Sequence, residues 1–180
     1  MSADPRPLTG EPLSLDLLNT RWMREGAVQD LLTDTDGLAV WLAANQLDVN
    51  ADADADAATL RHVLQARDAL AAVVDGSLAE GAAAVDAVLA HGRIRATLSA
   101  EGPGELPEFR DGSWRPAWIA ARDYLELLAT APDRIRRCAH GACILHFFDT
   151  SRNGTRRWCS MATCGNRAKA SRHYARSKDA

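Results

Sequence analysis

The sequence predicts an α+β protein, with a mainly helical N-terminal domain that carries a small β-hairpin, followed by a small module of a β-hairpin plus an α-helix. Two observations predict this fold class. Apolar residues recur at three- and four-residue steps through much of residues 1–132, as they do in helices that bury one face. All four cysteines then fall between Cys138 and Cys164, a cluster typical of a small metal-bound module. We therefore expect two domains, at 1–132 and 133–180.

The composition is that of a folded protein with unevenly distributed charge. Of 180 residues, 47% are apolar, which is enough for an ordinary core. The net charge is −3. Residues 134–180 carry eleven Lys or Arg against two acidic residues (+9), whereas residues 1–133 carry ten against 22 (−12). A basic end beside an acidic domain indicates an anionic partner for one of them.

The sequence lacks the usual signals of membrane insertion and secretion. No apolar run reaches the ~20 residues that a spanning helix needs. Residues 1–7 lack the charged-then-apolar pattern of a signal peptide. We therefore expect a cytoplasmic protein with no membrane partner, whose thiols stay reduced.

The first part of the N-terminal domain predicts short elements and a linker. Residues 13–20 are rich in leucine and fit either a short helix or a strand. Asp34 or Thr35 can cap a helix. The alternating Ala-Asp run at 51–57 could be a cation site, but it fits better a solvated linker whose last aspartate, Asp56, caps the next helix.

The middle of this domain contains the clearest helical pattern. Residues 57–75 have apolar side chains at helical steps, and Gly76 would end the helix. A second helix of about 78–90 ends before Gly92. Residues 93–98 alternate polar and apolar types, as a half-buried strand does.

Turns and a further helix complete the domain. Residues 101–104, Glu-Gly-Pro-Gly, predict a turn. Residues 109–114 place Asp-Gly between aromatic residues, which predicts a hairpin there. Pro116 can open a helix over about 117–130, and Pro132 marks the domain boundary.

The N-terminal domain shows no recognisable catalytic motif. It has no Walker loop, no Rossmann glycines, no nucleophile elbow and no metal-binding histidine pair on a helix. Asp16, Asn19 and Arg21 form its only compact polar group near the start, and such residues more often cap and brace than catalyse. We expect that the protein is not an enzyme.

The cysteines form two close pairs separated by 15 residues, a spacing that brings four ligands round one tetrahedral ion. Zinc suits four thiolates, which close its shell and make the site structural rather than catalytic. Two disulfides or an iron–sulfur cluster are the alternative uses of these residues, and a reducing cytosol argues against disulfides. His140 and His146 lie close enough to replace a ligand, but neither is needed. The expected ligands of one Zn²⁺ are Cys138, Cys143, Cys159 and Cys164.

The sequence between and after the pairs predicts the rest of the module. Residues 144–148 read as an apolar strand, Asn153-Gly154 as a turn, and 155–158 as the return strand. A helix is expected after the last cysteine. At 100° per residue, Lys169, Arg172 and Arg176 share one of its faces.

These residues resemble a known family. Residues 159–167, Cys-Ser-Met-Ala-Thr-Cys-Gly-Asn-Arg, follow Phe-Asp-Thr-Ser-Arg-Asn-Gly-Thr-Arg-Arg-Trp at 148–158. Together they resemble the CGNR zinc finger, and Leu-Asp-Leu-Leu-Asn-Thr at 15–20 resembles the opening of the ABATE domain that accompanies it. The resemblance implies a bacterial stress-induced transcription regulator whose finger binds zinc through the four cysteines and contacts DNA.

Arginine forks fit phosphate oxygens and can also bind guanine edges. The alternative is that the basic residues of the module keep it soluble or pair with the acidic domain. One of the arginines beside the zinc site could also be a structural partner. The second functional hypothesis is an adaptor whose finger binds an acidic protein without contacting DNA. The N-terminal domain would sense a small molecule or form a homodimer, since one finger offers few base contacts. The candidate DNA contacts are Arg152, Arg156, Arg157, Arg167, Lys169, Arg172 and Arg176.

Overall fold

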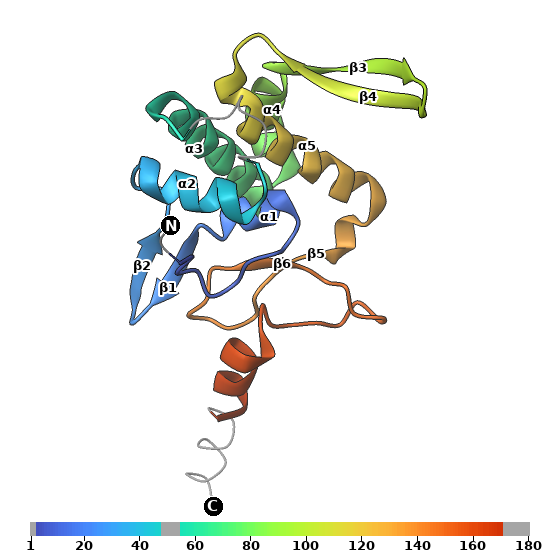
Figure 1. The fold of residues 1–180 in the computed structure, drawn as a ribbon. Coiled ribbons are helices and arrows are strands. Elements are labelled where there is room, and N and C mark those ends of the chain that lie inside the picture. Colours follow the sequence, from blue (N-terminus) through green and yellow to red (C-terminus); the bar gives the residue numbers. More distant parts are fainter. Residues whose placement is uncertain (1–2, 48–54, 171–180) are drawn as a thin grey trace, which may run out of the picture.

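The computed structural model describes residues 3–47 and 55–170, which form a helical body with a small cysteine-rich module on one side (Figure 1). The Ala-Asp run at 51–54 and the basic residues Arg172 and Arg176 lie outside the described residues. No helix among those described is both long and apolar enough to cross a membrane. The predicted α+β class, mainly helical with small antiparallel hairpins, is confirmed.

Helix α1 (Leu13–Leu18) lies at the centre of the body. The leucine-rich segment is therefore a helix rather than a strand, and Leu15 and Leu17 are completely buried. It packs against α3 (Ala57–Ala71) and α5 (Arg115–Thr130). Because α1 is buried on nearly all sides, its polar residues must find partners inside the protein.

Side-chain caps define where three helices begin, as expected from local sequence. The Asp34 carboxylate accepts the Gly37 N–H at the start of α2 (Thr35–Ala44). Asp56 caps α3 in the same way, as predicted. Ser77 caps α4 (Leu78–Leu89). Between α3 and α4 the chain forms a π-helical turn, Ala72–Gly76, so the first of these helices stops close to the predicted glycine.

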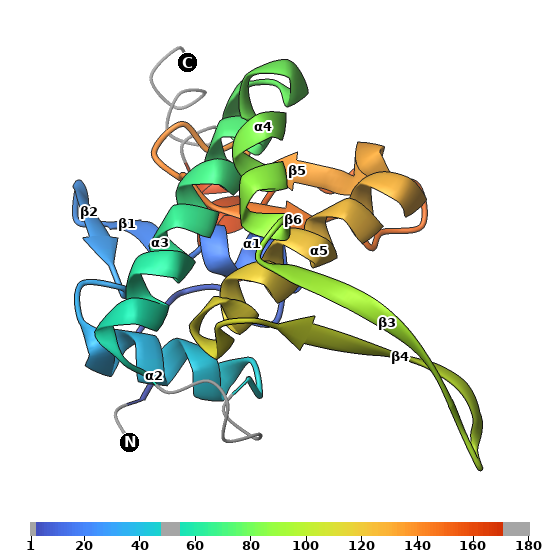
Figure 2. The same ribbon diagram turned by 90° about the horizontal axis from the view of Figure 1, so that it is seen from above.

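A long hairpin projects from the body (Figure 2). Strands β3 (Gly92–Ser99) and β4 (Gly102–Phe109) pair antiparallel, with Gly92 opposite Phe109. The prediction of a hairpin turn at Asp111-Gly112 was wrong. Asp111 instead accepts the Ser113 N–H and caps a 3-10 turn, Gly112–Trp114, that leads directly into α5.

A second hairpin was not predicted. Strands β1 (Arg21–Arg24) and β2 (Ala27–Asp30) are joined by Glu25 and Gly26. Both turn residues have positive φ angles, 53° and 82°, as a tight two-residue hairpin turn requires. The strands are too short and too polar for alternation to reveal them.

The cysteine-rich module has different strand pairing from that predicted. Strand β5 (Ile135–Arg137) pairs antiparallel with β6 (His146–Phe148). The predicted return strand at 155–158 is not formed, and β6 pairs with β5 instead. This segment contacts the β5–β6 loop through the Arg157 carbonyl, which accepts the Ala139 N–H. After the π-helical turn Met161–Gly165, residues 166–170 are helical.

The module is attached to the body through buried polar contacts. The Asn19 side chain donates to the His146 carbonyl and accepts its N–H, both at 2.8 Å. Glu11 accepts the Phe148 N–H at 2.8 Å. One continuous cluster of buried side chains also includes α1 and all four cysteines. The position of the module relative to α1 is therefore fixed by packing and by hydrogen bonds.

Candidate metal centre and basic surface

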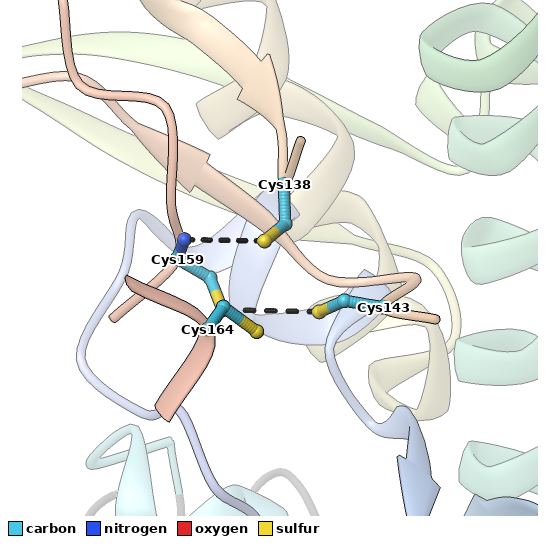
Figure 3. Close-up of side chains that lie close together, drawn as sticks. All are labelled: Cys138, Cys143, Cys159 and Cys164. Carbon is cyan, nitrogen blue, oxygen red and sulfur yellow. Dashed lines mark hydrogen bonds between the residues drawn. The ribbon is translucent and has the colours of Figure 1, made fainter. Parts of the chain in front are cut away.

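The fold brings the four cysteines together from three separate segments (Figure 3). Cys138 and Cys143 both lie in the connection between β5 and β6. Cys159 lies in the loop after β6, and Cys164 lies in the π-helical turn. All four are buried, and their sulfur atoms lie within 4.8 Å of one another. The close pairs in the sequence thus converge on one point.

The geometry of the sulfur atoms fits a tetrahedral ion. The Cys143 and Cys159 sulfurs are 3.8 Å apart, and those of Cys159 and Cys164 are 3.7 Å apart. Ligands about 2.3 Å from a tetrahedral zinc ion lie about 3.8 Å from each other, whereas a disulfide bond is about 2.05 Å long. The cysteines are unpaired. This donor set fits one structural zinc ion.

The thiols lie close enough to shift one another's pKa values. Hydrogen bonding from Cys159, followed by the Leu145 N–H and the other thiols, lowers the pKa of Cys143 to about 5. The same interaction and burial raise the pKa of Cys159 far above its usual range. Burial raises the pKa of Cys164 to about 12. Four thiolates at this distance repel one another, and a divalent ion removes that repulsion.

Neither nearby histidine belongs to the cysteine cluster. The His140 Nδ1 atom accepts the Ala142 N–H. The His146 Nε2 atom lies 3.0 Å from the Asp75 carboxylate, at the end of the turn after α3. Burial lowers the pKa of His146, against the opposing effect of Asp75. Both side chains therefore support the fold around the site.

Arg156 braces the metal centre and is half-buried rather than presented to solvent. Its guanidinium donates to the carbonyls of Phe148, Trp158 and Cys159. It also lies 3.3 Å from the Glu11 carboxylate. It stacks over the Phe147 ring at 4.2 Å. Arg156 is thus the arginine beside the zinc site that acts as a structural partner.

The other candidate contacts within the described residues are exposed. Arg152 lies in the turn after β6, and Arg157 lies beside Trp158 with its guanidinium 5.2 Å from the ring centre. Arg167 and Lys169 lie on the short helix that follows the last cysteine. These exposed basic residues thus lie on the segments that carry or adjoin Cys159 and Cys164.

Strand β5 adds basic residues that sequence reasoning missed. Arg136 and Arg137 are both exposed. Arg137 lies 3.6 Å from Asp75, whereas Arg136 makes only a 3.4 Å hydrogen bond to the Gly154 carbonyl. The sequence did contain a sign of them: residues 134–137, Arg-Ile-Arg-Arg, directly precede Cys138 and so belong to the module.

The compact polar group near the start of the chain braces the body. The Asp16 carboxylate is buried and accepts hydrogen bonds from Arg6, Gly10, Trp41 and Asn45. The Asn19 side chain forms hydrogen bonds with the backbone of His146 on β6. Arg21 lies on β1 and pairs with Asp30 at 3.0 Å.

Comparison with known families agrees with these features. The model of the CGNR zinc finger matches residues 134–177. A second model, that of the ABATE family, matches residues 11–131 and is described as "Putative stress-induced transcription regulator". A search of curated proteins found no match.

Proposed function

Because the chain belongs to the ABATE family and carries a CGNR zinc finger, we propose that it is a transcription regulator that binds DNA through this finger. In this proposal one zinc ion, held by the four cysteines, fixes the module and presents its basic side chains. The protein acts in the cytoplasm, where the thiols stay reduced, and has no catalytic role.

The observation that carries the proposal is the contrast between exposed basic and buried acidic groups on the finger. Arg152, Arg157 and Lys169 are exposed. Between Cys138 and Cys164 the one carboxylate, Asp149, is buried and accepts the N–H groups of Ser151 and Arg156. It therefore does not neutralise the exposed cations. A surface of this kind attracts the phosphate backbone of nucleic acids.

The N-terminal domain supplies the regulation in this proposal, by sensing a small molecule or by forming a homodimer. One finger contacts few bases, so that useful specificity requires a second copy. The projecting β3–β4 hairpin leaves Leu98 83% exposed and Leu106 46% exposed. Exposed apolar side chains on a projecting hairpin favour a contact with another protein surface.

Fluorescence anisotropy of a labelled mixed-sequence DNA duplex tests the proposal. Zinc-loaded protein is titrated at low and moderate salt, and the expected result is binding that weakens steeply as salt rises. The variant Arg157→Gln/Lys169→Gln should bind more weakly and show a shallower salt dependence.

The matched control is Arg24→Gln/Arg110→Gln, which removes the same charge from exposed positions on the N-terminal domain. It should bind like the wild type. No binding by the wild type at low salt would contradict DNA recognition and favour the adaptor that binds an acidic protein. Equal weakening by both double variants would show that net charge, rather than the finger, drives binding.

A further inference from the structure

The turn at residues 151–155 has a fixed shape. The Gly154 N–H donates to the Ser151 carbonyl, and the Asp149 carboxylate accepts the Ser151 N–H at 2.9 Å. Gly154 has a φ angle of +63°, in the left-handed region. The tip of this turn is therefore positioned by its own hydrogen bonds.

A half-buried arginine, Arg134, stabilises the turn through hydrogen bonds to its backbone. The Arg134 guanidinium donates to the carbonyls of Asp149 and Ser151. A Cβ atom at Gly154 would lie 3.3 Å from this guanidinium, so a side chain there would press on it. Arg134 is half-buried, and a single atom, Nη1, donates to both carbonyls.

Two other arginines lie at this turn and remain available. Arg152 is exposed and has no partner among the described residues. Arg136, on β5, reaches the turn through its 3.4 Å contact with the Gly154 carbonyl, and its other donors face no acceptor in the part of the chain described. We call Arg136 and Arg152 the basic edge.

Within the described residues, no carboxylate forms an ion pair with the basic edge. Asp149 is buried and its two oxygens accept backbone N–H groups. Asp133 is exposed near the start of β5 and forms no ion pair within the described residues. Asn153 and Thr155, also exposed, add neutral polar groups of the types that contact phosphates. The edge thus offers two guanidinium groups on a fixed scaffold.

The basic edge and the helix after Cys164 lie in different directions from the metal centre. The segment after β6 extends to the side of the module, whereas the helix points away from the body (Figure 1). A DNA-binding helix that enters a groove leaves the flanking phosphates to other elements of the same domain. A strand and a turn beside the helix are suited to that position.

We propose that the basic edge, Arg136 and Arg152, contacts the phosphate backbone of duplex DNA beside the segment bound by the finger helix. This inference rests on the proposed function. Both side chains act on phosphates, so they position the finger without reading sequence. Arg137 takes no part in this contact, because it lies against Asp75 of the body.

The test is the same anisotropy titration, run with the zinc-loaded full chain carrying Arg136→Gln/Arg152→Gln. The slope of log K against log salt is negative, and each lost phosphate contact makes it about 0.9 less steep, so the slope of the double variant should be about 1.8 less steep than that of the wild type. The loss of affinity should be the same on several unrelated duplex sequences. Zinc content and the unfolding midpoint should match the wild type, since both side chains are exposed.

The outcomes separate this inference from the proposed function. If Arg136→Gln/Arg152→Gln keeps the slope of the Arg24→Gln/Arg110→Gln control while Arg157→Gln/Lys169→Gln binds more weakly, the finger binds DNA but the basic edge does not. If the affinity loss depends on the duplex sequence, the edge reads bases and the phosphate assignment is wrong. If the wild type fails to bind any duplex at low salt, both proposals fail.

Discussion

Two arginines that follow one another in the sequence, Arg156 and Arg157, have different surroundings. Arg156 is half-buried and donates to three backbone carbonyls next to the metal centre, as well as facing Glu11. Arg157 is exposed, and its guanidinium lies 5.2 Å from the centre of the Trp158 ring. The guanidinium of Arg156 satisfies carbonyls that have no strand or helix partner, a task that needs several donors in one plane.

We expect Arg156→Lys to destabilise the protein by about 2–3 kcal/mol, because an ammonium group cannot replace the forked hydrogen bonds to buried carbonyls. Urea unfolding of the zinc-loaded protein measures this change. Arg157→Lys is the control and should stay within about 0.5 kcal/mol of the wild type. Similar effects of the two substitutions would show that Arg156 is no brace.

Arg67 on α3 is a buried cation that depends on one carboxylate. It is 2% exposed and contacts the Asp30 carboxylate at 2.7 Å and 2.9 Å. Burial acts to raise the pKa of Asp30, but hydrogen bonds from Arg67 and Arg21 outweigh it and hold this pKa below its usual value. The pair therefore joins α3 to the end of β2.

Asp30→Asn should lower the free energy of unfolding by about 2–3 kcal/mol near neutral pH, because it removes the charge-assisted hydrogen bonds between the buried Arg67 and its counter-ion. A carboxyl with a lowered folded-state pKa stabilises above its unfolded pKa of about 3.9, and that stability is lost as the pH falls through the folded value. The difference between wild type and variant should thus shrink below about pH 4. Denaturant unfolding of both proteins from pH 7 to pH 3 checks this, and a constant difference would contradict the assignment.

At the scale of elements, α1 and β6 form the junction between the body and the finger. Asn19 ends α1 and exchanges two hydrogen bonds with the backbone of His146. β6 is one strand of a two-stranded sheet, and such small sheets are marginal without further packing. The Asn19 side-chain amide thus bonds the outer N–H and carbonyl of β6 at His146, the groups that a third strand would otherwise pair with.

Asn19→Ala should cost about 2–4 kcal/mol, since it leaves a buried N–H and a buried carbonyl of β6 without partners. Hydrogen exchange of the His146 amide should also become faster, because its acceptor is removed. The exposed Asn166 provides the control, and Asn166→Ala should change neither quantity. Unaltered exchange in the Asn19 variant would show that packing alone holds the strand.

The elements also show which features a sequence can predict. The capping aspartates and the helices they begin depend on neighbouring residues, so Asp34, Asp56 and the helix from 57 onward were predicted correctly. The hairpin at Asp111 was not, because a capping hydrogen bond to Ser113 favoured a helical turn over a strand turn. The pairing of β5 with β6 was also missed, since both strands have only three residues, too few to show an alternating pattern.

The metal site was predictable from spacing, whereas the role of Arg156 was not. Two close cysteine pairs with a short insert have few ways to arrange themselves, and the four sulfurs converge as expected. A run such as Arg156-Arg157 gives no sign of which side chain points inward. Arg156 points inward because its guanidinium donates to nearby backbone carbonyls and to Glu11. Glu11 is far from it in the sequence.

At the scale of the whole molecule, the finger and the body share one buried cluster. The cysteines contact the same core as α1. Ion pairs join Arg137 to Asp75 and Arg156 to Glu11, and hydrogen bonds from His146 also cross between the module and the body. In isolated zinc-finger peptides, metal binding supplies roughly 10–16 kcal/mol, most of the stability of the fold. Here the body also holds the module, so that loss of zinc should disturb the finger first and then loosen α1.

If the zinc-bound finger is the part of the protein that binds DNA, as proposed, duplex binding should depend on zinc. Protein at a fixed concentration with labelled duplex at low salt is treated with a zinc chelator, and the anisotropy is followed together with the zinc released. We predict that the bound fraction falls in step with the loss of about one zinc per chain and returns when zinc is restored. Binding that survives complete removal of zinc, or zinc-loaded protein that never binds the duplex, would contradict the account.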